Sequence, residues 1–308
     1  MPSAVRAGRR RRLRGALRPA LLVRERVLLH LPFTLRYLRA RVSATLHRES
    51  LRTVLFYPGR PNPHHVAYKL FKARGWRISR DPTAACDFAI GWRYAGAAEP
   101  EPALRAIAER TFVLNLEFTD NSKRRVDAAA AEAFGHDIRI DPLTFSGPAV
   151  RKSDENARHD GTIVVCPIPV PDAACVYQRV VDNRVADGMV EDIRLPVFGG
   201  VVPFGYRKFR PLTDRFSNEN ACVEIAPIGD LLSEDELLRF LAFCRAVGLD
   251  WGEVDVLRDR GNGRLYVVDA NATPYGPPNH LPKHEAARAM AMLGEAFDRA
   301  FGERIRGE

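Results

Sequence analysis

The sequence contains few cysteines, and none of them is paired with another along the chain. Its 308 residues include five isolated cysteines: Cys86, Cys166, Cys175, Cys222 and Cys244. The absence of any CxxC pair excludes a zinc knuckle, a redox motif of that type and a secreted disulfide framework. Long apolar runs are also missing, because the charged residues 24–26 interrupt the longest candidate for a membrane-spanning helix. We therefore expect a cytoplasmic protein in a reducing environment.

Acidic residues are almost absent from the first fifty positions. This segment holds thirteen arginines, no lysine and only two glutamates, a net charge of +11, whereas the whole chain carries +9. The rest of the chain is therefore nearly neutral, at −2. Apolar residues recur at every seventh position of the segment: Leu21, Leu28, Leu35 and Val42. The pattern predicts a basic, amphipathic, helical leader over residues 1–50.

Several roles compete for this leader. It can pack on its own protein or a partner, lie on an anionic membrane surface, or act as an organelle transit peptide. The first two are favoured equally, so peripheral membrane association stays open, as does a homo-oligomer. Nucleic-acid binding is not expected, because only Phe33 and Tyr37 place aromatic rings among the arginines and no nucleic-acid fold signature occurs.

The rest of the chain alternates between strand and helix patterns. Residues 51–118 read as short apolar strands separated by helices, which predicts a small open sheet with mostly parallel strands. A capped helix over DNSKRRVDAAAAEAFG is followed by several strands and by a second capped helix over residues 233–248. Hairpins are expected to turn at Gly199-Gly200 and at residues 260–263. The fold class is therefore α/β, or α+β, with more than one lobe.

The second hairpin brings three oxygen-bearing side chains together. Asp255 lies on its first strand, and Asp269 and Asn271 lie two residues apart on its second strand, so the last two share a face. Any one of these residues alone favours a solvated strand position. Two carboxylates and an amide on one hairpin instead suit Mg²⁺, which prefers oxygen ligands and commonly shares them with phosphates.

The segment GLDWGEVDVLRDRGNGRLYVVDANATPYG resembles the C-terminal signature of the ATP-grasp superfamily of carboxylate-amine or carboxylate-thiol ligases. The upstream segments DNSKRRV, AVRKSDENARHDG, VYQRVVD and VEDIRLPVFGGVVPFGYRKF are similar to the family's lysine helix, lysine strand with phosphate loop, adenine hinge and central hairpin, in that order. The likeness covers about residues 51–298. It implies four parts: a leader (1–50), a pre-ATP-grasp α/β domain (51–120), a small lid subdomain (121–182) and a large subdomain with the metal hairpin (183–308).

The resemblance also implies a site for ATP and Mg²⁺, with two ions expected and Mn²⁺ as an alternative. Asp255 and Asn271 would each ligate a metal or share one, and Asp269 would bridge both. The residues implied to act on the transferred phosphate are Arg194, Arg207 and Lys208. Strand alternation lets only one of the last two point into the site. The residues implied to hold the nucleotide are Lys123, Lys152, Gly161, Gln178, Val180, Val181 and Asp192.

Several of these residues also have a simpler explanation. Lys152 fits a solvated lysine at a strand end as well as a contact to the α- and β-phosphates. Arg194 can be the partner of Glu253 or Asp255 rather than a phosphate ligand. The histidines of the first loop are expected to be ordinary loop residues, although ligands often bind at such a loop in α/β sheets. A catalytic dyad of His159 and Asp160 is the weaker account of those two residues.

The sequence departs from the family pattern in three places. Only sixteen residues, three of them proline, separate Gly161 from Gln178, so the helix that many members carry there is expected to be absent or reduced. Glu253 stands where some of these ligases have an arginine two residues before the first metal acid. The loop NARHDG is poor in glycine, so we expect side chains rather than backbone N–H groups to contact phosphates there.

The activity implied by the resemblance is an ATP-dependent ligase. It would activate a substrate carboxylate as an acylphosphate for attack by an amine or another nucleophile, and so form a C–N or related bond. An ATP-grasp kinase of a small molecule is one alternative. Another is a non-catalytic ATP-grasp scaffold whose leader binds a membrane or a partner. The residues expected to line the acceptor pocket are Tyr275, Gly276, Asn279 and His280.

Overall fold

The computed structural model describes residues 35, 37–39, 42–43, 52–94, 101–156, 158, 160–217 and 219–306. Most of the predicted leader over residues 1–50 lies outside the described residues, and so does His159. The leader residues that are described, 35, 37–39 and 42–43, are all helical. None of the described helices combines the length and the apolar character needed to cross a membrane.

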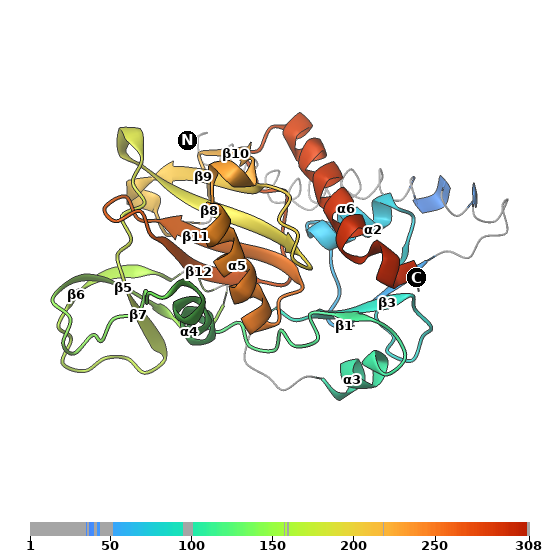
Figure 1. Cartoon of the computed structure of the whole chain (residues 1–308), viewed down its shortest axis with the longest axis horizontal. Coiled ribbons are helices and arrows are strands. Elements are labelled where there is room, and N and C mark those ends of the chain that lie inside the picture. The colour runs from blue at the N-terminus through green and yellow to red at the C-terminus, as the bar shows by residue number, and fades with distance from the viewer. Residues whose placement is uncertain are drawn as a thin grey trace, which may run out of the picture.

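The first domain is the small parallel sheet that the sequence predicts (Figure 1). Its strands, in the spatial order β2-β1-β3-β4, are β1 (Thr53–Pro58), β2 (Arg77–Ser79), β3 (Phe88–Trp92) and β4 (Val113–Leu114). All neighbours pair in parallel. Its helices are α2 (Val66–Ala73) and α3 (Pro102–Ala108). Three consecutive residues of β1 are buried, Val54 to Phe56, because both faces of this sheet are covered.

A second sheet of three antiparallel strands lies within residues 121–182, the predicted lid. Its strands, in the order β6-β5-β7, are β5 (Gly147–Ser153), β6 (Thr162–Cys166) and β7 (Cys175–Arg179). No helix occurs between Gly161 and Gln178, all of whose residues are described, so the expected loss of that helix is confirmed. The lid sheet therefore consists of strands and short connections alone.

The third and largest sheet is antiparallel throughout and carries the predicted hairpins. Its strands, in the order β10-β9-β8-β11-β12, are β8 (Met189–Phe198), β9 (Gly205–Pro211), β10 (Cys222–Ala226), β11 (Trp251–Arg258) and β12 (Leu265–Asn271). Short 3-10 turns precede β8 and flank β10: Ala186–Gly188, Leu212–Asp214 and Ile228–Asp230. The remaining helices are α4 (Lys123–Phe134), α5 (Glu234–Val247) and α6 (Lys283–Arg306).

The two helices with strong sequence signals begin and end where their caps predict. Ser233 and Glu236 form a reciprocal capping box at the start of α5, which satisfies two backbone N–H groups. The side chain of Ser122 likewise caps α4. Both helices end at a glycine in the left-handed conformation, Gly135 with φ of 74° and Gly248 with φ of 76°. These predictions are confirmed.

Alternation along the large sheet separates an apolar face from a polar one. One face carries Ile193, Leu195, Val254 and Val256, which pack under α4 and α5 in a single core. Residues of the opposite parity on the same strands point away from those helices and include four charged side chains, Asp192, Arg194, Glu253 and Asp255. Within the predicted lid region 121–182, α4 thus packs on α5 and the large sheet and also bonds to β7 through Asp127 and Gln178.

The first domain and the large sheet share a second hydrophobic core and are also joined by hydrogen bonds of Asn115. Phe71 of α2 contacts both Trp251 of β11 and Phe297 of α6. The Asn115 side chain accepts from the backbone N–H groups of Asp250 and Trp251 at 2.9 Å and donates to the Trp251 carbonyl at 2.8 Å. These contacts fix the carboxyl ends of the parallel strands beside the polar face of the large sheet.

Candidate nucleotide and metal site

The polar face of the large sheet collects the predicted metal residues in register. Asp255 lies directly opposite Asp269 across the β11–β12 ladder, and Glu253 lies opposite Asn271. On the other side of β11, Asp255 is paired in register with Arg194 of β8. Directly opposite residues of neighbouring strands share a face, so these five side chains lie on one surface.

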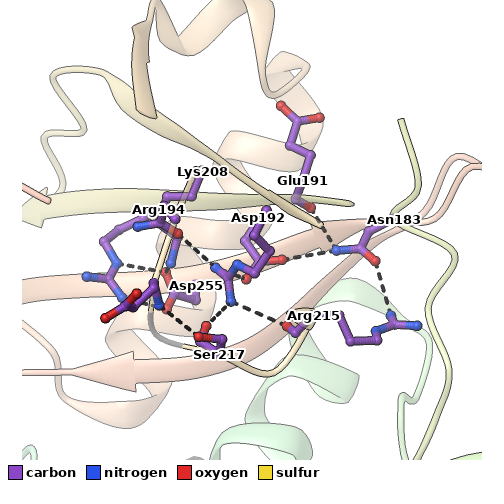
Figure 2. Close-up of polar contacts among 11 residues, drawn as sticks. Asn183, Glu191, Asp192, Arg194, Lys208, Arg215, Ser217 and Asp255 are labelled. Carbon is purple, nitrogen blue, oxygen red and sulfur yellow. Dashed lines mark hydrogen bonds and ion pairs between the residues drawn. The ribbon is translucent and has the colours of Figure 1, made fainter. Parts of the chain in front are cut away.

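Asp255 is held by two cations, Arg194 of the neighbouring strand β8 and Lys208 of the next strand, β9 (Figure 2). Arg194 donates from Nε to Oδ1 at 2.8 Å and from a terminal nitrogen to Oδ2 at 2.9 Å. Lys208 Nζ donates to the same Oδ1 at 2.9 Å. Burial opposes ionisation of Asp255, but the charges of Arg194 and Lys208 hold its pKa well below the usual range. The alternative in which Arg194 is the partner of Asp255 matches this contact.

Asp269 is paired with the lysine that opens α4. Lys123 Nζ forms an ion pair with Asp269 Oδ1 and donates to Asn156 Oδ1 at 2.9 Å. Lys123 is buried, and Asn156 belongs to the loop that follows β5. A single ammonium therefore joins the helix, the lid loop and the metal hairpin.

The oxygen atoms of the candidate metal set differ in availability. Asn271 Oδ1 accepts from the backbone N–H of Thr273 at 2.8 Å and from its hydroxyl at 3.0 Å. Both lone pairs of this oxygen are thus in use, and Asn271 must release Thr273 before it can ligate a cation. Among the described residues no three His, Cys, Asp or Glu side chains gather as a metal site. The two carboxylates and one amide suit Mg²⁺, given that local rearrangement.

Arg207 is not on this face. It lies opposite Ile193, whose side chain is in the core under α5, and it forms an ion pair with Glu191. The expectation that Arg207 faces the phosphates is therefore corrected. Alternation along β9 turns Lys208 to the site, where it is buried.

Asp192, expected near the ribose, lies further along the same polar face. Arg210 forms an ion pair with Asp192 at 2.8 Å. Asn183 Nδ2 donates to Asp192 Oδ1 at 3.0 Å (Figure 2). Arg210 also donates to the carbonyl of Ser217 at 2.6 Å. Burial raises the pKa of Asp192, although the charges of Lys208 and Arg210 oppose the shift. The residue is thus part of a polar network whose role in nucleotide binding stays a prediction.

Behind the lid, Gln178 and Lys152 surround an acid that the sequence reading missed. Gln178 Nε2 donates to both oxygens of Asp127 at 2.8 and 2.7 Å. Burial raises the pKa of Asp127 to about 6, although Lys152 opposes the shift. Asp127 lies four residues after Lys123 on α4, and this spacing places the two on the same helix face, a signal that was available in the sequence.

Lys152 is not a solvated lysine in this structure. Its Nζ donates to the carbonyl of Val268 at 3.3 Å. Burial, together with the charge of Lys123, lowers its pKa to about 8. Lys123 and Lys152 therefore lie close together near Asp269. A bound anion would reduce the electrostatic repulsion between them.

The remaining nucleotide candidates lie at the lid and at the hinge. A Cβ atom at Gly161 would approach the ring of Phe216 to 2.9 Å, so only glycine fits there without a shift. Val181 is buried against Ile138 and Tyr266, and the partly buried Val180 precedes it. Asp160 Oδ1 accepts from the backbone N–H of Ser153 at 3.1 Å, as a loop residue would. His159 lies outside the described residues.

The first loop of the parallel sheet reaches the segment that follows the metal strand. The ring of His65 is buried and lies against that of Tyr275 at a tilt of 33°, with ring centroids 4.1 Å apart. Burial lowers the pKa of His65 to about 4. Lys69 Nζ donates to the carbonyl of Gly276 at 2.5 Å. The other two residues expected in the acceptor pocket are exposed: Asn279 and His280.

Glu253 lies between that loop and the metal residues. It is 3% exposed, and Arg194 is 3.5 Å from its Oε2. Burial raises its pKa to about 7, although the charge of Arg194 opposes the shift. The position at which the resemblance leads one to expect an arginine thus holds a buried acid.

Comparison with known proteins gives one partial sequence relative and many solved structures. No model of a protein family matches the chain. A D-alanine--D-alanine ligase of Xylella fastidiosa is 37% identical over 78 residues, which cover 24% of this chain and 24% of that ligase. The match thus spans about a quarter of the relative's length.

Two of the similar solved structures cover most of the chain. The ATP-grasp ligase PsnB, complexed with minimal precursor, Mg and ADP, has a TM-score of 0.51 and 14% identity over 83% of this chain and 99% of that one. The D-alanine--D-alanine ligase from Bacillus anthracis, complexed with ATP, has a TM-score of 0.51 and 14% identity over 84% of this chain and 99% of that one.

Proposed function

The chain has the ATP-grasp fold, and on that premise we propose that it is a Mg²⁺-dependent ligase that joins a carboxylate to a nucleophile at the expense of ATP. The carboxylate is activated as an acylphosphate, which the nucleophile then attacks. The observation that carries the proposal is the pairing of Asp255 with Asp269 on one sheet face, ringed by Arg194, Lys208 and Lys123. A scaffold has no physical need for three converging oxygen ligands, which here are Asp255, Asp269 and Asn271.

The cations of this site are the proposed partners of the phosphates. Arg194 and Lys208 are oriented by Asp255, and each would exchange a hydrogen bond to that carboxylate for one to the transferred phosphoryl group when Asp255 binds a metal ion. Lys123 and Lys152 approach from α4 and from the lid sheet. Mg²⁺, when bound by Asp255, Asp269 and Asn271, would supply further positive charge between the phosphates. The solved neighbours that contain ATP, or ADP with Mg, support this choice of ligands.

The first domain is proposed to form the part of the site where the substrates bind. Its loop before α2 contacts Tyr275 and Gly276, which follow the metal strand directly. Substrates held there would lie beside the phosphate cluster and be shielded from water by the lid. Shielding limits hydrolysis of the activated carboxylate.

The proposal is tested by Mg²⁺-dependent ADP release with a pool of carboxylates and amines. Asp269→Asn should reduce the rate by roughly a hundredfold or more, because one acid that faces the phosphate cluster loses its charge. Asp235→Asn, an exposed acid on α5, is the matched control and should change nothing. If the folded wild-type protein binds no Mg·ATP in calorimetry, the ligase proposal fails.

The product separates a ligase from a kinase. A ligase forms one condensed product per ADP and requires both a carboxylate and a nucleophile. A small-molecule kinase leaves a stable phosphorylated product and requires no second substrate. Mass spectrometry of the reaction mixture therefore decides between them.

A second candidate function concerns the basic leader. Its described apolar residues are about half exposed: Leu35 at 50%, Leu38 at 50% and Val42 at 59%. The ring of Tyr37 instead makes a cation–π contact with Lys72 of α2, whose Nζ is 4.1 Å from the ring centre. With its excess of arginine, such a segment suits an anionic membrane surface.

Vesicle sedimentation tests this role in the full-length protein. Binding to vesicles that contain phosphatidylglycerol, lost in Leu38→Glu and retained in the control Leu238→Glu on α5, would support it. Equal binding by a chain that begins at Leu51 would remove it.

A further inference from the structure

Glu253 has a carboxylate oxygen that no hydrogen bond satisfies. The residue is 3% exposed, and its Oε2 is fully buried without a hydrogen-bond partner among the described residues. A buried polar atom without a partner costs free energy, and more so when it belongs to a charged group. The free protein therefore keeps a costly acceptor on the strand that carries Asp255.

Arg194 places one of its nitrogens close to that oxygen. Its Nε and Nη2 donate to the two oxygens of Asp255 at 2.8 and 2.9 Å. Its third nitrogen, Nη1, forms an ion pair with Glu253 Oε2 at 3.5 Å but no hydrogen bond. One guanidinium thus stands between two acids and is hydrogen-bonded to one of them.

Other nearby donors are directed elsewhere. Lys69, whose charge also acts on Glu253, donates to the carbonyl of Gly276 at 2.5 Å. The hydroxyl of Tyr206, which lies opposite Arg194 on β9, is buried and has no partner among the described residues. Of these groups, all of them within the described chain, Arg194 is the one that forms an ion pair with Glu253.

Strand geometry places both acids within reach of the same arginine. Glu253 and Asp255 are two residues apart on β11, so their side chains leave the same face. Arg194 lies directly opposite Asp255 on β8. Shortening the separation of 3.5 Å to about 3.0 Å is enough to form a charge-assisted hydrogen bond to Glu253.

The demands on Asp255 change when it serves as a metal ligand. A cation bound to its carboxylate repels the guanidinium, so the hydrogen bonds from Arg194 weaken. A buried guanidinium that loses an acceptor needs another one, since its N–H groups would otherwise stay unsatisfied. Glu253 Oε2 is an acceptor that is already buried beside it.

We propose that Glu253 is a second anchor for Arg194, to which the guanidinium passes a hydrogen bond when Asp255 binds Mg²⁺. Glu253 is then a positioning residue: it keeps the guanidinium in place while Nε and Nη2 turn from Asp255 to the phosphates. The five N–H donors of a planar guanidinium can serve an acid and a phosphate together, which suits arginine to this role. The inference rests on the proposed ligase function and adds the residue that holds Arg194 in its metal-bound state.

Calorimetry of the full-length protein tests the inference without turnover. The affinity for AMP-PNP is measured with Mg²⁺ and with EDTA, and the ratio of the two affinities is the metal-dependent gain. Glu253→Gln keeps the shape but removes the charge, so the gain should fall about tenfold. The affinity in EDTA should stay within about twofold, because Asp255 holds Arg194 there. Glu224→Gln, an exposed glutamate of β10, is the matched control and should change neither affinity.

Metal-free stability separates a positioning role from a structural one. Because Oε2 is unbonded in the free protein, Glu253→Gln should not lower the free energy of unfolding in EDTA. In an Arg194→Met background, Glu253→Gln should reduce the metal-dependent gain no further, since the guanidinium that would move is gone. If Arg194→Met does not fold, Glu253→Asp gives a second test: it keeps the charge but withdraws it from Nη1, and the gain should still fall.

An unchanged metal-dependent gain in Glu253→Gln would overturn the inference. So would an equal loss of affinity with Mg²⁺ and with EDTA, or a variant that is less stable than the wild type in EDTA. A folded wild-type protein that binds no Mg·AMP-PNP would remove the proposed ligase itself. The wild-type titration therefore tells the two failures apart.

Discussion

The ammonium of Lys123, the first residue of α4, is paired with the carboxylate of Asp269 in β12, and it also donates to Asn156 of the lid loop at 2.9 Å. These three residues come from three different parts of the chain. Their contact makes the helix start, the lid and the metal hairpin mutually dependent. Phosphate entering this cluster would meet a lysine that is already oriented.

We predict that Lys123→Ala weakens binding of Mg·AMP-PNP by roughly tenfold to a hundredfold, because a charged donor to phosphate is lost. Calorimetry measures the change. Lys283→Ala is the matched control, since Lys283 is the first residue of α6 and is exposed. Similar affinities for Lys123→Ala and the wild type would show that this lysine only supports Asp269.

We predict that nucleotide binding takes up protons near pH 8 through Lys152. Burial lowers the pKa of this lysine to about 8 in the free protein, so it is partly deprotonated at that pH. Nearby phosphates favour the charged form and raise the pKa, and a proton is then absorbed. Calorimetry in buffers of different ionisation enthalpy measures the uptake at pH 8 to 9. Lys152→Met should abolish it, and an uptake that survives this change contradicts the assignment.

We predict that Asp127 makes the protein less stable as pH rises from 4 to 7. The folded pKa of about 6 exceeds the ordinary value of 3.8, so the folded state holds the proton to higher pH than the unfolded state does. Its contribution to stability is complete below about pH 4 and is lost as pH rises through 6. Two pKa units correspond to about 3 kcal/mol. Urea unfolding of the wild type and Asp127→Asn should therefore give profiles that diverge by about that amount across this range, whereas parallel profiles would exclude it.

The helices and strands of this chain could be predicted from its sequence because local chemistry determines where they begin and end. Ser233 and Gly248 mark α5 because a side-chain oxygen satisfies the first N–H groups and a left-handed glycine ends the last turn. The pairing of Asp255 with Asp269 followed from two strands and a short turn between them. Each of these inferences needs only residues that are close in sequence.

The remaining features of the site depend on contacts between segments that are far apart in sequence. Alternation along β9 required that either Arg207 or Lys208 face the site, but the choice is made by Ile193, which packs opposite Arg207 under α5. Asp127 and Gln178 meet across 51 positions of sequence. No local pattern reports such a pairing, because it follows from how α4 docks against the lid.

The glycines that end α4 and α5 offer a matched pair for measuring how the first domain is docked. Both adopt nearly the same positive φ, so alanine should cost each helix end a similar amount, roughly 1–2 kcal/mol. A Cβ atom at Gly135 would meet nothing within 4 Å, whereas one at Gly248 would lie 2.6 Å from the carbonyl carbon of Glu117.

Glu117 follows β4 of the first domain, so Gly248→Ala must push that domain away from α5 as well as strain the helix end. We predict that Gly248→Ala lowers the free energy of unfolding by about 1–3 kcal/mol more than Gly135→Ala does. Denaturant unfolding of both variants measures the difference. Equal losses would mean that the contact with Glu117 relaxes freely, and that the Asn115 hydrogen bonds and the core around Phe71 and Trp251 hold the first domain to β11 without it.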